Sequence, residues 1–381
     1  MHYLDHAATT PVLEEVKDAM LRVYEEDFGN PSSVHAYGRR ARELVEDARD
    51  RLAAAVGASP AEIVFTGGGT EADNLALKGA ASKLRGNGNH IVTTTFEHHG
   101  VLDAIEWLEH QGFEVTRVPV TRDGVVDPAA VAAAVRPQTI VVSVMAVNNE
   151  IGTIQDITGI VAVVRKANPN ALVHTDAVQA LGNIPVDVHA WGVDLAAFSA
   201  HKLGGPKGVG ALFVRASVPV EAVIHGGGQE RGLRSGTLNV AGIAGFGIAA
   251  EIAAKEVYEK TERLGELRDR LLEGIRTAVP DVVVNGTLDN RVAGNLHVSI
   301  TGTDGETLLL LLDRAGIAVS TGSACQSGAV DPSHVLLAIG SDKDLAKGSI
   351  RFSLGRASSA SDVAAALEAL PDIVARARKV G

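Results

Sequence analysis

The sequence predicts an α/β protein: a mainly parallel sheet with helices on both faces, followed by a smaller α+β domain. Two observations lead to this prediction. First, short Val- and Ile-rich runs alternate with amphipathic segments between residues 62 and 215, as in parallel strands joined by crossover helices. Second, a chain of 381 residues exceeds what one ordinary hydrophobic core organises, which indicates two domains.

Two amphipathic helices open the chain. The first is expected over residues 11–28, with Pro11 as a favourable first helical residue. The second is expected over residues 33–57 and ends at Gly57. Strands and helices then alternate. Strands are predicted at 62–66, 90–96, 139–147, 171–177, 193–200 and 208–215, and helices at 70–85, 100–112 and 157–168.

The pattern changes after residue 240. A long helix from about Val240 to Val279 is expected to lead into the second domain. Beyond it, strands are predicted at 295–300 and 348–355, and helices at 305–316 and from about Ser361 onward.

These patterns give a domain division. The large domain is predicted over residues 11–255 and the small C-terminal domain over residues 256–381. We expect residues 1–10 to pack on the small domain, which also carries a cysteine-bearing loop at 320–334.

Composition and charge exclude several classes of protein. The net charge of -11 argues against a broad nucleic-acid surface. The most apolar helical stretch, residues 240–255, contains Glu251 and is too short to span a membrane. The N-terminus lacks the basic-then-apolar pattern of a signal peptide, so a cytoplasmic protein is expected. A single cysteine excludes an internal disulfide and a multi-cysteine metal site.

A glycine-rich turn joins the first predicted strand to its helix. In "IVFTGGGTEADNLAL", three glycines precede Thr70. Glycines let backbone N–H groups approach a ligand, and a helix N-terminus attracts anions. The segment matches neither the nucleoside triphosphate loop nor the dinucleotide fingerprint. It is either a phosphate site or a tight turn capped by Thr70.

A lysine after another predicted strand is the sharpest local signal. In "FSAHKLGGPKGVGAL", Lys202 follows an apolar run and precedes a glycine-rich turn. A lysine beside phosphate donors suits a Schiff base with an aldehyde cofactor, and Ser199 and His201 could reach the same phosphate. Asp176 also ends a strand and could partner a protonated ring nitrogen. The alternatives are a solvated loop lysine and an aspartate that caps a helix.

Four further segments carry candidate residues. His98, beside His99, follows a strand and could stack on a ring and move protons; adjacent histidines point apart, which disfavours a metal. Asn149 follows another strand and could bind a hydroxyl or carboxylate. Arg351 lies in a strand-like run and suits either a substrate carboxylate or a structural ion pair. The segment with Arg234 and Thr237 is a possible phosphate contact.

The only cysteine lies in "GSACQSGAVDP". Its neighbours are glycines and serines, whereas a cysteine kept for packing usually lies in an apolar run. Cys325 is therefore either a chance thiol or a nucleophile. No Lys or Arg lies within ten residues of it, so the sequence does not show how a thiolate would be stabilised.

Ten segments, in this order, resemble the pyridoxal-phosphate-dependent cysteine desulfurases, the NifS/IscS-like branch of the class-V aminotransferase family. The resemblance runs nearly end to end and implies the aminotransferase-like PLP-dependent fold (fold type I). The segments are YLDHAATTP, GNPSSVHAYGR, TGGGTEADNLA, EHHGVLD, VNNEIG, HTDAVQALG, FSAHKLGGPKGVG, GGGQERGLRSGTLN, GSACQSG and SIRFSLGR.

The resemblance implies roles toward pyridoxal 5'-phosphate. Lys202 would form the Schiff base, Asp176 would pair with the ring nitrogen, and Gln179 would bond the ring hydroxyl. His98 would stack on the ring and take part in catalysis. Thr237 would reach the phosphate from the second subunit of a homodimer. The other phosphate contacts would be Gly69, Thr70, Ser199 and His201.

It also implies the reaction. Asn149, which would contact the cofactor too, and Arg351 would bind the carboxylate of L-cysteine. Lys202 would remove the α-proton, and Cys325 would take the sulfur as a persulfide, leaving L-alanine. Acceptors would be an iron–sulfur scaffold or tRNA-thiolating enzymes. The long loop after Cys325 resembles the branch with an extended cysteine loop. No resident metal is expected, although Cys325 could transiently share a cluster with a partner.

Three other functions remain open. Another enzyme of the same fold, such as an aminotransferase, a selenocysteine lyase or a kynurenine-type hydrolase, would also use Lys202 and Asp176, whereas Cys325 favours the desulfurase. A non-catalytic scaffold would have no need for these residues. A nicotinamide dehydrogenase is disfavoured because no dinucleotide fingerprint follows any strand.

Overall fold

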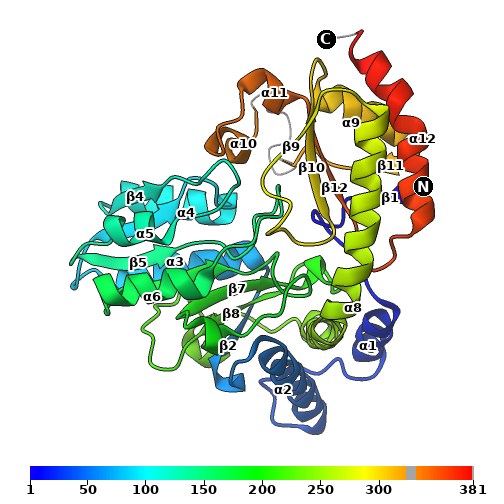
Figure 1. Ribbon diagram of the computed structural model, residues 1–381. Coiled ribbons are helices and arrows are strands. Elements are labelled where there is room, and N and C mark those ends of the chain that lie inside the picture. The colour runs from blue at the N-terminus through cyan, green and yellow to red at the C-terminus, as the bar shows by residue number, and fades with distance from the viewer. Residues whose placement is uncertain (323–331, 380–381) are drawn as a thin grey trace.

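The computed structural model describes residues 1–322 and 332–379 (Figure 1). Its largest sheet has seven strands in the order β2-β8-β7-β6-β5-β3-β4. The pairings from β7 to β4 are parallel, and only β8 runs antiparallel to its neighbours. The predicted mainly parallel sheet is therefore confirmed. The strands are β2 (Ile63–Thr66), β3 (His90–Thr94), β4 (Glu114–Val118), β5 (Thr139–Ser143), β6 (Leu172–Asp176), β7 (Leu195–Ser199) and β8 (Gly210–Val214).

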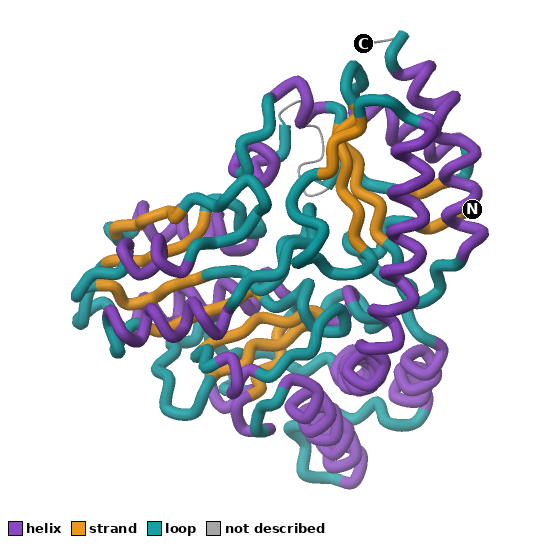
Figure 2. Tube along the Cα trace, viewed as in Figure 1, coloured by secondary structure: helices purple, strands orange, loops and turns teal. Residues whose placement is uncertain are grey.

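Helices cover both faces of this sheet (Figure 2). Neighbouring residues of one strand, such as Val141 and Val142, belong to separate buried apolar clusters, as the alternation of side chains along a strand requires. One face packs against α3 (Gly69–Leu84) and α4 (His99–His110). Helices that contribute to the other face are α2 (Ala36–Val56), α5 (Pro128–Ala134), α6 (Ile157–Ala167), α7 (Val188–Trp191) and the start of α8 (Val240–Ala278).

A third apolar cluster lies in the C-terminal part of the chain. It joins Leu4 to residues between Leu264 and Ala377. Its antiparallel sheet has the order β12-β10-β9, and β1 pairs with β11. This separate core supports the proposed two-domain division. The elements are β1 (His2–Tyr3), β9 (Val282–Val284), β10 (Asn295–Ile300), β11 (Ile317–Ala318), β12 (Ser349–Ser353), α9 (Gly305–Arg314), α10 (His334–Ala338), α11 (Lys343–Lys347) and α12 (Ala360–Ala377).

Some helices and strands begin or end at residues other than those predicted. One cause is hydrogen bonding between segments that are distant in the chain. The first helix, α1 (Glu14–Glu25), begins after Pro11, because Thr10 N and Leu13 N donate to the carbonyls of His201 and Gly204. The second helix ends as predicted, at Gly57 in the left-handed conformation with φ 69°. Strand β4 and helix α5 were missed, since β4 is a partly exposed edge strand with a weak apolar pattern.

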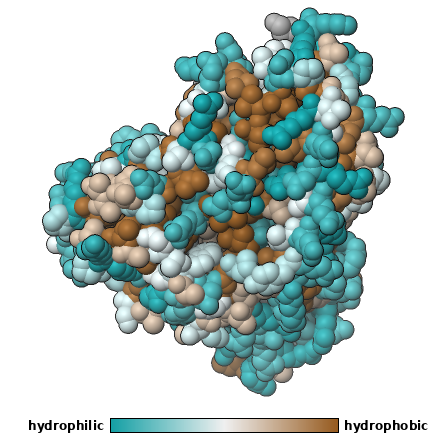
Figure 3. All heavy atoms as spheres, viewed as in Figure 1, coloured by the Kyte–Doolittle hydropathy of each residue, from teal (hydrophilic) through white to brown (hydrophobic). Residues whose placement is uncertain are grey.

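The space-filling view shows apolar side chains gathered over the small sheet and toward the centre of the visible face (Figure 3). Within the described ranges, no helix combines the length and the apolar composition needed to cross a membrane.

Candidate active site

The predicted site residues converge at one edge of the large sheet. Strands β3, β5, β6 and β7 are parallel, so their carboxyl ends share that edge. Strand β2 runs in the same direction as these strands, because β2 and β7 are both antiparallel to β8. Their last residues, Thr66 and Ser199, both pair with Gly210 of β8. Residues that follow these strands therefore meet, which is where open α/β sheets bind ligands.

Lys202 lies at the end of a single 3-10 turn, η2 (Ala200–Lys202), directly after β7. Its Nζ donates to the carbonyl oxygens of Ala7 and Ala8, at 2.7 and 2.8 Å. These bonds hold the amine against the N-terminal segment, between two cavities. Lys202 lines one of them, whereas Ala8 lines the other.

The glycine turn forms one wall of a cavity of about 480 Å³. Gly69 is the first residue of α3, and a Cβ there would lie 2.6 Å from Val178 Cγ2, so only glycine fits. All four predicted phosphate residues of this chain line the cavity. Its lining is Ala8, Thr9, Gly67, Gly68, Gly69, Thr70, Glu71, Ser199, His201, Lys207 and Gly208.

His201 is neutral near pH 7. Burial, with Lys202 and Lys207 nearby, lowers its pKa to about 4. Its Nδ1 lies 3.2 Å from Thr9 Oγ1. The cavity thus offers backbone N–H groups of a helix N-terminus, hydroxyls, a neutral imidazole and the cation Lys207, which is the chemistry of a phosphate site.

Asp176 and His98 approach each other beside Lys202. Asp176 is the buried last residue of β6, and its Oδ1 accepts from Val178 N at 2.9 Å. Burial raises its pKa, while His98 and Lys202 oppose that shift. His98 is the N-cap of α4, and its Nδ1 accepts from Gly100 N at 3.0 Å, so the ring proton is on Nε2. A cation such as a protonated ring nitrogen would stabilise ionised Asp176.

Gln179 and Asn149 line the second cavity, of about 420 Å³, together with Lys202. Gln179 Nε2 donates to Ala7 O at 3.0 Å, so Gln179 and Lys202 share one carbonyl. This cavity also touches the small domain through Asn295 and Ser353. The cavity is large enough to admit a small amino acid, and the polar side chains of Gln179, Asn149 and Lys202 are the groups in it that could orient one.

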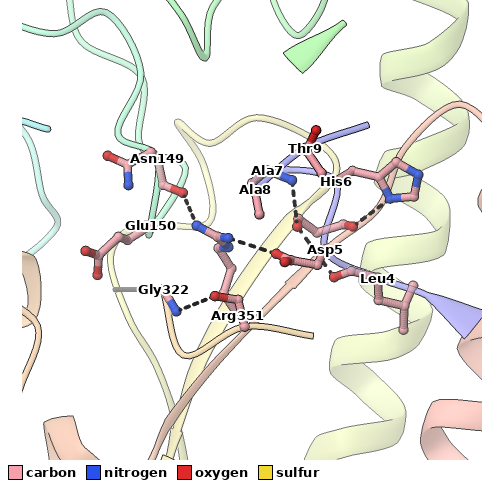
Figure 4. A network of polar contacts seen from close by, with 12 residues as sticks. Leu4, Asp5, His6, Ala7, Ala8, Thr9, Asn149, Glu150, Gly322 and Arg351 are labelled. Carbon is pink, nitrogen blue, oxygen red and sulfur yellow. Dashed lines mark hydrogen bonds and ion pairs between the residues drawn. The ribbon is translucent and has the colours of Figure 1, made fainter. Parts of the chain in front are cut away.

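Arg351 lies behind this cavity, in the middle of β12 (Figure 4). Its Nη1 donates to the backbone oxygen of Asn149 at 2.7 Å, and its Nη2 donates to Asp5 Oδ1 at 2.9 Å. Its buried Nε has no hydrogen-bond partner among the described residues. The structure therefore shows the ion pair that the sequence left as an alternative. Arg351 is not among the described residues that line either cavity.

Two predicted residues are not brought to the site by this chain. Thr237 is exposed and is not among the described residues that line either cavity. Cys325 lies outside the described residues. The neighbouring Arg234 pairs with Glu71, whose Oε2 accepts from Gly67 N at 2.8 Å. Arg234 thereby braces the glycine turn.

Sequence reasoning missed the N-terminal segment and two groups beneath Asp176. Residues 5–10 contact Arg351, Gln179, Lys202 and His201. Asp73 and His174 are fully buried next to Asp176. The spacing of Asp73, one helical turn after Gly69, was the signal that could have found it. Polar side-chain atoms of Asp73, His98 and Asp176 lie within 4.8 Å of one another.

Comparisons with known proteins agree with this geometry. The model of the class-V aminotransferase family matches residues 2–366. A curated protein of Dictyoglomus turgidum named cysteine desulfurase IscS is 47% identical over 378 residues, 99% of this chain and 95% of that protein. A solved NifS-like protein superposes with a TM-score of 0.94 and 40% identity, over 99% of this chain and 100% of that chain.

A third relative is a solved structure described as SspA in complex with cysteine. It has a TM-score of 0.83 and 34% identity, and the match covers 93% of this chain and 99% of that chain. Full-length similarity and the shared fold lead to one conclusion: the chain belongs to the class-V aminotransferase family, in its branch of NifS- and IscS-like cysteine desulfurases.

Proposed function

We propose that this chain is a cysteine desulfurase that uses pyridoxal 5'-phosphate to convert L-cysteine to L-alanine. The observation that carries the proposal is the position of Lys202. Its amine donates to the carbonyls of Ala7 and Ala8, and these two residues line two neighbouring cavities, one of which has groups suited to a phosphate.

The residues present fit the cofactor. Gly69, Thr70, Ser199 and His201 line one cavity at the N-terminus of α3, where backbone N–H groups favour an anion. Asp176 is a buried carboxyl with a raised pKa, and a protonated ring nitrogen beside it would favour its ionised form. Lys202, Asp176, Gln179 and His98 would hold the ring. When bound, pyridoxal 5'-phosphate supplies an electron sink for a carbanion at the substrate α-carbon.

The chain's own residues would perform the remaining steps. Lys202 Nζ, positioned by the carbonyls of Ala7 and Ala8, would accept the α-proton of L-cysteine. Asn149 and Arg351 would orient the substrate carboxylate, using the unpaired Nε of Arg351. His98 would keep its imidazole neutral, because burial lowers its pKa, and would present Nε2–H.

Cys325 would accept the sulfur. Its thiolate attacks the substrate sulfur, the carbon–sulfur bond breaks with its electron pair remaining on carbon, and a proton completes alanine. The products are alanine and a persulfide on Cys325, so atoms and electrons balance without another oxidant. The persulfide sulfur would then pass to an acceptor protein, such as an iron–sulfur scaffold.

The assembly and location are part of the proposal. A homodimer would bring Thr237 of the second copy to the phosphate cavity, which this chain's Thr237 does not line. We expect a cytoplasmic enzyme that binds neither nucleic acid nor membranes directly.

The deciding experiment measures alanine and sulfide formed from L-cysteine with a reductant, in wild type and Cys325→Ala. We expect equal amounts of both products from wild type and a loss of both in the variant. Sulfide release that survives loss of Cys325, or transamination without sulfide, would move the protein to another activity of this fold. Failure of the wild type to take up pyridoxal 5'-phosphate would favour a non-catalytic role.

A further inference from the structure

Asp73 is a buried carboxyl that the proposed mechanism does not use. It lies on α3, one turn after Gly69, so the two residues share a helix face. That face points at the carboxyl end of β6, where Asp176 lies. The exposed fraction of Asp73 is 1%, and burying a carboxyl this deeply is costly unless it is neutral or paired.

The contacts of Asp73 connect it to the cofactor residues. A Cβ on Gly100 would lie 3.1 Å from Asp73 Oδ2 and 3.1 Å from His98 Nδ1, so the bare glycine lets both side chains approach α4. Potential ligand atoms of Asp73, His98 and Asp176 all lie within 4.8 Å of one another. Asp73 therefore lies directly behind Asp176, the residue that would face the ring nitrogen.

His174 lies on the other side of Asp73. It precedes Asp176 by two residues, so both side chains lie on the same face of β6. His174 Nε2 lies 3.4 Å from Asp73 Oδ1, and His174 Nδ1 lies 2.9 Å from Ser143 Oγ. Neither His174 Nε2 nor Asp73 Oδ1 has a hydrogen-bond partner among the described residues, so His174 lies beside Asp73 without bonding to it. Asp73 Oδ2 is the oxygen near Gly100 and His98.

The charges around Asp73 favour its acid form. Burial lowers the pKa of His174 to about 3, so His174 is neutral. Burial also lowers the pKa of His98. Burial raises the pKa of Asp73 well above the usual range, and the neighbouring carboxyl of Asp176 adds to this shift. Two carboxyls this close in a dry site do not both ionise readily.

We propose that Asp73 is a positioning residue that retains the proton of the Asp73–Asp176 pair, so that Asp176 is the ionised member and faces the cofactor ring nitrogen. The inference rests on the proposed function, because that nitrogen belongs to the cofactor. Asp73 acts through Asp176 and does not touch the reacting atoms.

The test compares Asp73→Asn and Asp73→Ala with wild type. Asparagine keeps the shape, neutrality and donor of a protonated aspartic acid, whereas alanine removes the donor. Two quantities are measured: the Kd of pyridoxal 5'-phosphate for the cofactor-free protein, and the pH midpoint of the visible absorbance of the bound cofactor. Glu97→Gln is the matched control, because it also replaces a buried acid, one held by Thr94 and Met145 instead.

We expect Asp73→Asn and Glu97→Gln to keep the Kd within about threefold of wild type, and Asp73→Ala to raise it about tenfold or more. In Asp73→Asn, the pH midpoint of the cofactor absorbance should stay within roughly half a pH unit of the wild-type value. If Asp73 were ionised, asparagine would remove a nearby negative charge and shift the midpoint by about two units. That shift, or an alanine variant that matches wild type in Kd, would overturn the inference.

The outcomes distinguish failure of this inference from failure of the proposed cysteine desulfurase function. A wild type that takes up no pyridoxal 5'-phosphate overturns the proposed function and this inference together. If the wild type binds pyridoxal 5'-phosphate but Asp73→Asn shifts the midpoint by about two units, or Asp73→Ala keeps the wild-type Kd, only the inference about Asp73 is overturned. Thermal unfolding of the cofactor-free variants checks folding. If Asp73→Ala does not fold, the midpoint of the isosteric Asp73→Asn decides by itself.

Discussion

Asp5 and Arg351 form an ion pair that ties the N-terminal segment to the middle of β12, with Nη2 and Oδ1 at 2.9 Å (Figure 4). Arg351 is buried, and its Nη1 is also occupied, by the carbonyl oxygen of Asn149. The guanidinium is thereby fixed in place, while its buried Nε has no hydrogen-bond partner among the described residues. The same N-terminal segment carries the carbonyls of Ala7 and Ala8 that hold Lys202.

Arg351→Lys tests this arrangement. Lysine keeps the positive charge, but its single ammonium cannot hydrogen-bond to Asp5, to the Asn149 carbonyl and to a substrate carboxylate at the same time, as a planar guanidinium could. We expect the KM for L-cysteine to rise about tenfold, with a smaller change in kcat. Steady-state alanine formation measures both constants. Arg117→Lys, which alters an exposed pair with Glu109, is the control. Equal KM values in the two variants would show that Arg351 is only structural.

Lys202→Arg separates the structural and covalent roles of the lysine. Arginine can still donate to the carbonyls of Ala7 and Ala8, so the protein should fold, but it cannot form a Schiff base with an aldehyde. We expect the thermal unfolding temperature to stay near that of the cofactor-free wild type. Alanine formation should be lost, and borohydride reduction should no longer fix the cofactor to the protein. Fixation of the cofactor in this variant would place the covalent bond elsewhere.

Ser333→Ala tests the hydrogen bonds that Ser333 makes at the start of α10. Ser333 Oγ donates to the buried Glu150 and accepts from Val335 N and Leu336 N at the start of α10. We expect a loss of about 1–3 kcal/mol in the free energy of unfolding. Because Glu150 also packs against Gly322, where a Cβ would lie 3.1 Å from its Oε2, kcat should fall roughly tenfold.

The control for this variant is Ser359→Ala. Ser359 caps the exposed start of α12, so its loss should cost about 1 kcal/mol and leave alanine formation unchanged. Denaturant unfolding and alanine formation are measured for both variants. If the two serine variants lose the same stability and Ser333→Ala keeps its full kcat, Ser333 is merely a helix cap.

Glu97→Gln tests the pH dependence of stability. Burial raises the pKa of folded Glu97 to about 8, against a usual value of 4.5. The folded state therefore keeps a proton that the unfolded state has lost. This stabilisation is complete below pH 4.5 and is lost as the pH rises through about 8.

The stability advantage of wild type over Glu97→Gln should thus decline by up to about 1.4 kcal/mol per pH unit inside that window. Urea unfolding of both proteins at several pH values between these limits measures the difference. Glutamine can keep the bonds from Thr94 Oγ1 and Met145 N, so the variant should fold. If the free energies of unfolding of wild type and Glu97→Gln change with pH in the same way, Glu97 is ionised in the folded protein.

Local patterns were enough to predict much of the site. Gly69, Thr70, Ser199 and His201 follow strands that point the same way, and the structure places all four around one cavity. The reason is general: parallel strands end at one edge, so residues just after them must meet. Thr237 stays a proposal, because its role depends on a second copy of the chain.

The sequence by itself determined the alternation of strands and helices, the glycine turn at the start of α3 and the lysine after β7, because each depends on neighbours only a few residues away. Only the tertiary structure decided that Asp5 meets Arg351, that Ala7 meets Lys202 and that Asp73 lies beneath Asp176. These contacts join segments that are distant in the chain. They exist because burial forces charged and polar groups to find partners or stay neutral, and no local pattern records that requirement.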